Sequence, residues 1–187
     1  ANKSAITFFT LDGTDPDINS TTYANPIEIN QTTTLKYFSK DLFNNVEQVQ
    51  SNDYTIDKIA AISTSSVSTG YYNSTQQVSL SNNESSTIYF TLNGQIPNTS
   101  STVFTSPIAV TDSSVITFFS VDSVGNTESV ISVNIIIDRI SPISSVSISG
   151  EHNTVQEIEF SVNEQATIFY TLDGTDPTVN SQKYTDK

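Results

Sequence analysis

The sequence predicts an all-β protein built from tandem β-sandwich modules of the immunoglobulin or fibronectin type. Composition is the first indication: Ser and Thr make up 55 of the 187 residues, Asn adds 17, and the only aromatic residues are Tyr and Phe. These residue types favour strands and turns over helices. The other two indications are an internal repeat and, within it, short apolar runs that alternate with turn residues.

A seven-residue segment occurs three times along the chain. Residues 10–16 and 171–177 both read Thr-Leu-Asp-Gly-Thr-Asp-Pro, and residues 91–97 are a diverged copy, at spacings of 81 and 80 residues. Further residues match at the offset of 81, and they are Tyr23 with Phe104, Pro26 with Pro107, Phe38 with Phe119, Asp41 with Asp122, Asn45 with Asn126, and Glu47 with Glu128. Agreement at so many positions of one offset indicates a repeated module.

The repeat divides the chain into three predicted units. Residues 1–58 form a partial repeat without its opening strands, residues 59–138 a complete repeat, and residues 139–187 a partial repeat without its closing strands. Half a sandwich leaves a core face and strand edges open, so we expect the chain to be a window on a longer array. The linkers near residues 57–59 and 138–142 contain no Gly, which favours a fixed, extended relation between modules.

Short apolar or alternating runs predict the strands of the complete repeat and the first strand of the next. They are residues 78–80, 87–92, 108–110, 115–121, 130–137 and 143–148. About seven strands per module is typical of a small sandwich. Phe8 and Phe9 are adjacent, as are Tyr89 and Phe90, so their side chains point to opposite faces of one strand. We expect one face to be core and the other an interface or shielded patch.

Two kinds of turn account for the best-matched polar residues. Asp12-Gly13, and the equivalent pairs in the other copies, are hairpin dipeptides that tolerate a positive φ. A second turn follows Asp41 in the first copy and Asp122 in the second. There Asn44 stands where the second copy has Gly125, an exchange expected at a left-handed backbone position.

This combination of motifs resembles the chitobiase/β-hexosaminidase C-terminal domain-like family, whose tandem copies occur in prokaryotic surface proteins and beside glycosidase catalytic domains. The residues that carry the resemblance are Tyr23, Pro26, Leu35, Phe38, Asp41, Asn45, Glu47 and their partners 81 residues later. The resemblance covers essentially the whole chain. It implies non-catalytic sandwiches and supplies no catalytic residues.

Composition excludes several classes of function. A formal net charge of −13 opposes binding to nucleic acid and to anionic lipid surfaces. The chain has no Cys, so it has neither a disulfide nor a thiolate metal site, and its single His152 offers no triad. No apolar run is long enough to span a membrane, and no acidic pair stands apart from the repeat, so we expect no enzyme activity and no membrane contact.

Carboxylates at two positions of the repeat suggest candidate calcium sites, which compete with an interpretation as turn residues. Asp12 with Asp15, or Asp173 with Asp176, puts two carboxylates on one loop, but the central copy has Asn93 and Ile96 there. The second candidate set is Asp41, Asn45 and Glu47, repeated as Asp122, Asn126 and Glu128. Because Asp and Asn commonly hydrogen-bond turn backbone, we interpret both as structural and expect no cofactor, with Ca²⁺ as the alternative.

The predicted function is a non-catalytic, semi-rigid spacer in an extracellular, cell-surface protein such as an adhesin stalk, sheath or filament. Its expected partners are neighbouring repeats of the same or identical chains, and glycans or cell-wall polymers. The alternatives are a self-assembling filament subunit and a carbohydrate-binding accessory module that would use Tyr71 and Tyr72. Glycosylation would fall on the sequons Asn2, Asn19, Asn30, Asn73, Asn83 and Asn98, although this Ser- and Thr-rich composition produces about as many by chance.

Overall fold

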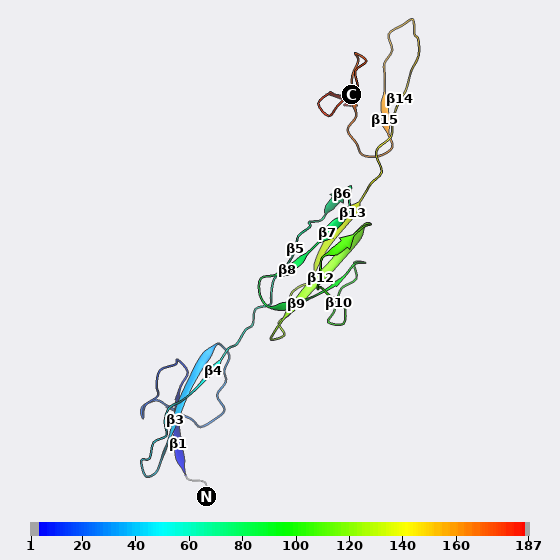
Figure 1. The fold of residues 1–187 in the computed structure, drawn as a ribbon. Coiled ribbons are helices and arrows are strands. Elements are labelled where there is room, and N and C mark those ends of the chain that lie inside the picture. Colours follow the sequence, from blue (N-terminus) through cyan, green and yellow to red (C-terminus); the bar gives the residue numbers. More distant parts are fainter. Residues whose placement is uncertain (1–3, 186–187) are drawn as a thin grey trace.

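A computed structural model describes residues 4–185, and those residues form strands, turns and loops without a helix. Figure 1 shows three parts that follow one another end to end, with the two termini at opposite ends of an elongated molecule. Every strand pairing stays within one part. The all-β sandwich class is confirmed, whereas the domain boundaries at residues 58 and 138 stay predictions. No described helix is long and apolar enough to cross a membrane.

The N-terminal part is a four-stranded antiparallel sheet in the order β2-β1-β3-β4. Its strands are β1 (Ala5–Thr10), β2 (Thr21–Thr22), β3 (Thr33–Asp41) and β4 (Gln50–Tyr54). β1 pairs with β3 along its whole length, from Ala5 opposite Asp41 to Thr10 opposite Lys36. On one face Phe8 stacks on Phe38, with ring centroids 5.3 Å apart, and both side chains are buried.

The central part contains a five-stranded sheet in the order β10-β9-β12-β13-β6 and a second layer of two short pairs, β11-β7 and β5-β8. Its strands are β5 (Ser63–Ser65), β6 (Gly70–Tyr72), β7 (Gln76–Val78), β8 (Leu80–Asn82), β9 (Ser86–Thr91), β10 (Thr102–Val103), β11 (Ile108–Val110), β12 (Ser114–Asp122) and β13 (Ile131–Ile137). The hydrophobic core lies between these layers, and its buried members are Val78, Leu80, Ile88, Val110, Ile116, Phe118, Val133 and Ile135.

Both faces of β12 are shielded from water, as the paired aromatic positions predict. Phe118 belongs to the core and is 0% exposed, whereas Phe119 points to the other face, is 5% exposed and stacks on Tyr89 at 5.5 Å. The loop between β9 and β10 is held on this second face: the carbonyl of Gln95 accepts hydrogen bonds from the hydroxyls of Thr91 and Thr117. The sheet therefore has a core face and a covered outer face.

The strands differ from the predicted runs at the start of the module. The run at residues 78–80 is divided between β7 and β8, because the backbone of Ser79 hydrogen-bonds to Ser66 instead of continuing either strand pair. β5 consists only of Ser and Thr and was not predicted, since it has no apolar alternation. β6 was also missed; its parallel pairing with residues 135–137 of β13 is a long-range contact without a local signal.

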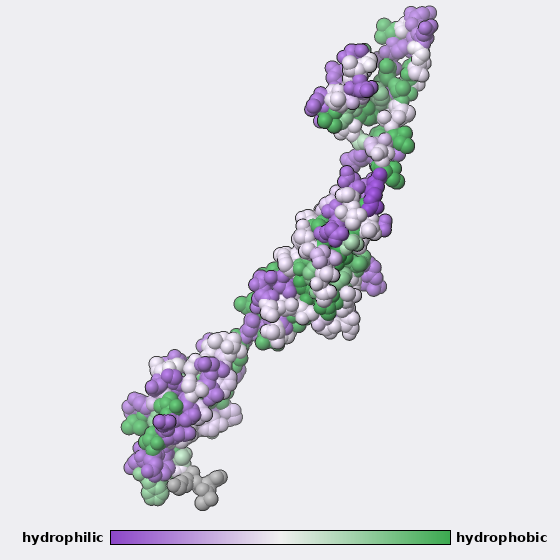
Figure 2. Space-filling view, viewed as in Figure 1, coloured by the Kyte–Doolittle hydropathy of each residue, from purple (hydrophilic) through white to green (hydrophobic). Residues whose placement is uncertain are grey.

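The C-terminal part has two separate strand pairs. The first joins β14 (Ser144–Val146) to β15 (Phe160–Val162), and the second joins β16 (Phe169–Tyr170) to β17 (Gln182–Lys183). They meet through Phe160, whose ring centroid lies 6.1 Å from that of Tyr170 and 5.1 Å from that of Tyr184. Figure 2 shows hydrophobic residues between the two arms of this part.

The turn predictions are confirmed in conformation but only partly in length. Asn44 has φ 66° and Gly125 has φ 97°, so both take the predicted left-handed conformation. Gly13 is also left-handed at φ 79°. However, Asp12-Gly13 does not form a tight two-residue hairpin: β1 ends at Thr10 and β2 begins at Thr21. The Asp12 carboxylate instead caps a longer loop by accepting hydrogen bonds from the N–H and hydroxyl of Thr14.

Candidate functional site

The most elaborate polar site is the junction cluster, which comprises Asp122, Asn126, Glu128, Ser63 and Ser120. Asp122 ends β12 and holds the turn that follows: its Oδ1 accepts the N–H groups of Val124, Gly125 and Asn126, at 2.8 to 2.9 Å. Burial raises the pKa of Asp122, but the hydrogen bonds from Asn126 and the turn backbone outweigh this effect, and the pKa lies below its ordinary value.

Glu128 fastens the opening strand of the module to β12. Its Oε1 accepts the N–H of Ser63 at 2.7 Å, and its Oε2 accepts the hydroxyl of Ser63. The same Oε2 accepts the N–H of Ser120 at 3.1 Å and its hydroxyl at 2.9 Å. Ser63 and Ser120 are buried, so these hydrogen bonds replace water for groups that have lost it.

Asn126 connects the same turn to the linker that precedes the module. Its Nδ2 donates to Oδ2 of Asp122 at 2.8 Å and also lies 3.2 Å from the carbonyl of Asp57 and 3.4 Å from that of Ile59. The Asp-x-x-x-Asn-x-Glu pattern thus forms a joint: Asp122 shapes the turn, Asn126 holds the linker and Glu128 holds the opening strand.

The first copy has the turn but not the rest of the joint. Asp41 Oδ1 accepts the N–H groups of Phe43 and Asn45, and its Oδ2 accepts Nδ2 of Asn45 at 2.8 Å. These hydrogen bonds, first those from Asn45, hold the pKa of Asp41 below its ordinary value. Among residues 4–185, the Glu47 carboxylate accepts the N–H of Ser39 alone, and the side chain is exposed.

Sequence reasoning found three members of the cluster and missed Ser63 and Ser120. A signal was present, because Ser39 and Ser120 share one repeat position, and Ser63 and Ser144 share another. Serine is too common in this chain for those matches to stand out. Only the fold brings residues 63 and 128 together.

A comparison with known protein families decides the relationship. The chitobiase/β-hexosaminidase C-terminal domain matches residues 1–51, 67–132 and 148–187, which is most of the chain. The chain belongs to this family. Its members are non-catalytic accessory domains, and the three matched segments confirm the resemblance carried by the repeat. A search of curated proteins finds no match to the chain.

In this member of the chitobiase/β-hexosaminidase C-terminal domain family, the aspartate carboxylates proposed as calcium ligands already accept hydrogen bonds. Both carboxylate oxygens of Asp122 and of Asp41 accept donors from their own turns. Residues 4–185 contain no group of three or more His, Asp or Glu side chains arranged to hold a metal ion. A cation at either turn would have to displace those donors.

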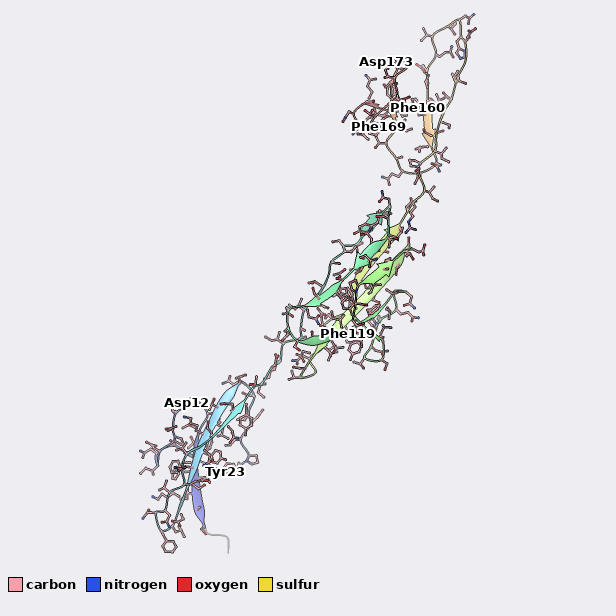
Figure 3. All side chains as sticks on the ribbon, viewed as in Figure 1. Asp12, Tyr23, Phe119, Phe160, Phe169 and Asp173 are labelled. Atoms are coloured by element: carbon pink, nitrogen blue, oxygen red, sulfur yellow. The ribbon has the colours of Figure 1, made fainter. Side chains whose placement is uncertain are left out.

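The other candidate carboxylates lie on the family's Thr-Leu-Asp-Gly loop, far apart in the two terminal parts (Figure 3). The N–H and hydroxyl of Thr14 donate to Asp12, as described above. Asp15 forms an ion pair with Lys36 at 2.7 Å. In the third copy the N–H and hydroxyl of Thr175 donate to Asp173 in the same way. Hydrogen bonds from the neighbouring Thr lower the pKa of both Asp12 and Asp173. The carboxylates of Asp12 and Asp173 therefore cap their own loops, and that of Asp15 pairs with Lys36.

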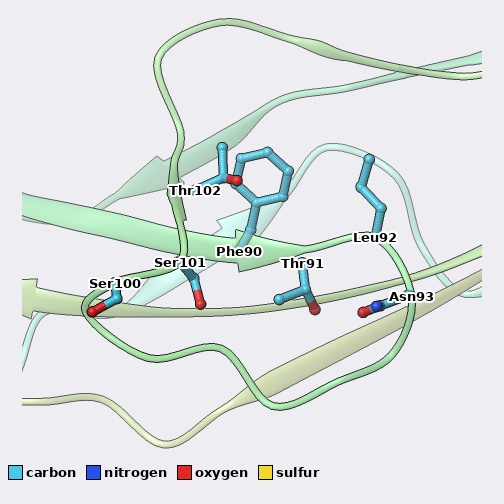
Figure 4. A pocket seen from close by; sticks show the side chains of 7 residues that line it. All are labelled: Phe90, Thr91, Leu92, Asn93, Ser100, Ser101 and Thr102. Carbon is cyan, nitrogen blue, oxygen red and sulfur yellow. The ribbon is translucent and has the colours of Figure 1, made fainter.

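A surface groove of about 430 Å³ lies beside this loop in the central copy (Figure 4). Its lining residues are Phe90, Thr91, Leu92, Asn93, Ser100, Ser101 and Thr102. None is an acid or a base, so the groove contains neither the carboxylate pair of a glycosidase nor a nucleophile with its base. Thr91 is already hydrogen-bonded to Gln95 and Thr117. The hydrogen bonds that hold this loop therefore account for the groove.

The remaining predicted site residues lie at the surface. The five sequon asparagines among the described residues, Asn19, Asn30, Asn73, Asn83 and Asn98, are all exposed. Asn2 lies outside those residues. Tyr71 is 81% exposed, whereas Tyr72 packs against the core and its hydroxyl donates to the carbonyl of Ser68. The two tyrosines therefore do not form one flat platform for a sugar. His152 is exposed and joins no cluster of titratable groups within residues 4–185.

We expect the free energy of unfolding to fall as the pH drops below about 4. Hydrogen bonds lower the pKa of Asp12, Asp17, Asp41, Asp122 and Asp173 in the folded chain, whereas an unfolded Asp titrates near pH 3.9. A lowered folded pKa contributes stability that is complete above the unfolded pKa and is lost as the pH falls through the folded pKa. Circular dichroism melts between pH 7 and pH 2 would measure this. High salt would screen the mutual repulsion of the acidic residues, and a melting temperature that stays constant there down to pH 2 would contradict the expectation.

Proposed function

We propose that the chain is a non-catalytic structural repeat region of an extracellular surface protein, where it acts as a semi-rigid spacer in a stalk, sheath or filament. The observation that carries the proposal is a set of hydrogen bonds, here called the linker clamp, that fixes the linker after each of the first two parts. The domain family occurs in secreted glycosidases, which favours an extracellular place. Neighbouring repeats are the expected partners, followed by glycans or cell-wall polymers.

The linker clamp begins with a cation at the same repeat position in both linkers. Lys58 Nζ donates to the carbonyl of Asn30 at 2.5 Å, and Arg139 Nη2 donates to the carbonyl of Thr111 at 2.7 Å. Residues 30 and 111 differ by 81, as do residues 58 and 139. Each cation therefore ties its linker back to the same loop of the preceding module.

Backbone groups of both linkers have matching partners. The N–H of Ile56 donates to the hydroxyl of Thr32 at 3.1 Å, and that of Ile137 donates to Ser113 at 2.9 Å. The aspartate that follows caps the linker: Asp57 accepts the N–H of Ile59 at 3.0 Å. Asp138 does the same for the N–H of residue 140 at 2.9 Å. The bonds to Thr32 and Ser113 hold each linker to the module that precedes it, and the two aspartates cap the linker itself.

The following module holds the first linker from the other side. Asn126 reaches the carbonyls of Asp57 and Ile59, and Asn83 Oδ1 accepts the N–H of Ile62 at 2.7 Å. The third part repeats the last contact, with Asn163 and the N–H of Ile143 at 2.7 Å. A short linker held from both ends resists bending, which is the property that a spacer needs.

We expect Asn126→Ala to make the chain more flexible between its first two parts. The change removes the donor to Asp57 and Ile59, at a cost in unfolding free energy of about 1 kcal/mol. Small-angle X-ray scattering should give a lower radius of gyration and a broader distance distribution, with and without Ca²⁺. Asn45→Ala is the matched control, because Asn45 has the same repeat position but, within the described part of the chain, its side chain bonds to Asp41 of its own turn and to no linker.

Equal scattering from the Asn126→Ala and Asn45→Ala chains would remove the support that the linker clamp gives to a stiff spacer. A calcium-dependent change in the unsubstituted chain would instead assign Asp41, Asn45 and Glu47, or their central equivalents, to a cation. A rod-like shape in both conditions supports the passive spacer.

A further inference from the structure

Tyr71 is a large aromatic side chain that the complete central module leaves in water. It lies on β6, an edge strand of the five-stranded sheet, and is 81% exposed. Tyr72 points to the opposite face and packs against the core. Within residues 4–185 the Tyr71 side chain makes no hydrogen bond and stacks on no other ring. The packing of the module therefore does not account for an aromatic residue at this position.

Asn73 follows Tyr71 on the same side of the chain. Alternate residues of a strand point to the same face, and Asn73 comes directly after the last residue of β6. It is exposed and begins the sequon Asn73-Ser74-Thr75. Among the five sequons in the described part of the chain, only this one has an aromatic residue two positions before its Asn. The residues at that position in the others are Asp17, Glu28, Ser81 and Ile96.

The side-chain amide of Asn73 is free, whereas most of the other sequon amides are engaged. Three of them form hydrogen bonds: Asn19 donates to Asp17, Asn83 accepts the N–H of Ile62, and Asn98 accepts the N–H of Ser100. Within residues 4–185, the side-chain amides of Asn73 and Asn30 have no hydrogen bond. These two asparagines can therefore be modified without the loss of a contact made by their side chains.

The hydroxyl group of the sequon separates these two candidates. Thr32, in the sequon of Asn30, belongs to the linker clamp: its hydroxyl accepts the N–H of Ile56 and donates to the carbonyl of the same residue. Thr75 Oγ1 accepts Arg139 Nη2 at 3.1 Å, and in the described part of the chain its O–H has no acceptor. The sequon of Asn73 thus has both its amide and its hydroxyl proton available.

The third copy of the repeat lacks both the aromatic residue and the sequon. At the offset of 80, Tyr71 corresponds to Glu151, Asn73 to Asn153 and Thr75 to Val155. The Asn is kept, as a residue that suits a turn, but neither the ring nor the hydroxyl is kept. Joint presence in one copy and joint absence in the other is expected if the ring and the sequon serve the same ligand.

We propose that Asn73 carries an N-linked glycan and that the first sugar of this glycan stacks on the ring of Tyr71. One face of a sugar ring presents C–H groups, so stacking removes apolar surface of both partners from water. The proposal rests on the extracellular place that the proposed function gives the chain, and it goes beyond the spacer role.

The attachment is a group transfer from a sugar carried on a lipid-linked pyrophosphate. Nδ2 of Asn73 attacks C1 of that sugar, and the N–C1 bond forms while the bond from C1 to the pyrophosphate oxygen breaks. The pyrophosphate leaves with the bonding electrons, and Nδ2 releases one proton. No oxidant or reductant is needed. The Thr75 hydroxyl is the group that the sequon requires two positions after its Asn.

A glycan at Asn73 would lie beside the second linker. The N–H of Asp138 donates to the carbonyl of Tyr72 at 2.8 Å, and Arg139 reaches Thr75. Figure 1 shows β6 at the end of the central part from which this linker leaves. Because β6 is an edge strand, its open side could pair with a strand of another chain. A bulky, hydrated glycan next to it hinders such pairing.

Site-resolved mass spectrometry of the chain secreted from eukaryotic cells tests the attachment. A glycosidase that converts each glycan-bearing Asn to Asp in heavy-oxygen water marks the occupied sequons. We expect Asn73 to be occupied in most copies, and several-fold more often than Asn83 or Asn98, whose amides are engaged. Asn73→Gln should remove the glycan from this peptide alone.

Melting temperatures test the stacking, after the glycan has been trimmed to its first sugar. The sugar should raise the melting temperature of the Tyr71 chain by several degrees, and that of the Tyr71→Ala chain by much less. Tyr71→Phe is the matched control, because it keeps the ring and should keep the rise. Since Tyr71 is exposed, neither substitution should change the melting temperature of an Asn73→Gln chain, which carries no sugar at this site.

Two results at Asn73 would overturn the proposal. One is an unoccupied Asn73, whether or not the other sequons carry glycans. The other is an equal rise in melting temperature in the Tyr71 and Tyr71→Ala chains, since the sugar would then make no contact with the ring. Neither result bears on the stiffness of the spacer, which scattering from the Asn126→Ala chain tests separately.

Discussion

Replacing Phe118 with Ala should unfold the central module well below the melting temperature of the unsubstituted chain. Phe118 is 0% exposed and lies in the core between the five-stranded sheet and the second layer. Truncation of a buried Phe typically costs about 3–5 kcal/mol, because both the transfer free energy and packing around the cavity are lost. That is a large share of the stability of a small domain, which is about 5–15 kcal/mol.

The repeat supplies a matched control for this substitution. Tyr37 occupies the same repeat position in the first copy, but it lines an open groove instead of a closed core. Tyr37→Ala should therefore cost about 1 kcal/mol or less. Hydrogen exchange with mass spectrometry can follow residues 62–137 separately from the rest of the chain. Comparable loss of protection in the two variants would show that the central core is not closed in solution.

The fold class could be predicted from the sequence because three independent signals agree. The offset of 81 indicates a repeated module, the Ser- and Thr-rich composition favours strands and turns, and the short apolar runs at β9 and β12 indicate strands. What could not be predicted depends on long-range pairing. β5 has no apolar residue, and β6 is in the sheet only because it runs parallel to the end of β13.

The candidate site could be predicted in part, for a similar reason. Asp122 and Asn126 are local turn residues, and their roles follow from spacing along the chain. Glu128 was a candidate calcium ligand. In the structure its carboxylate accepts hydrogen bonds from Ser63, which is 65 positions away, and from Ser120, which is 8 positions away. A carboxylate at one repeat position carries no sequence signal that separates metal binding from hydrogen bonding to a distant strand. Its hydroxyl partners, Ser63 and Ser120, come together only in the folded module.

Glu128→Ala should be the second most damaging substitution, although it removes no hydrophobic contact. It would leave the buried N–H and hydroxyl of Ser63 and the N–H of Ser120 without this acceptor, whereas the hydroxyl of Ser120 keeps the carbonyl of Ala61. An unsatisfied buried donor costs about 1–3 kcal/mol, and part of the loss is recovered if water enters, so we expect about 2–4 kcal/mol in total. Glu128→Gln keeps the shape but offers one acceptor oxygen, and it should fall in between.

Glu47→Ala separates this effect from the general loss of a negative charge. Glu47 has the same repeat position and the same sequence context, yet it is exposed and accepts one backbone N–H. Its removal should change the unfolding free energy by about 0.5 kcal/mol or less. Hydrogen exchange should rise first at residues 61–65 in Glu128→Ala, because the carboxylate attaches the opening strand to β12. If instead both variants lose the same stability, the joint is held by Asn126 and the core, and Glu128 serves mainly as surface charge.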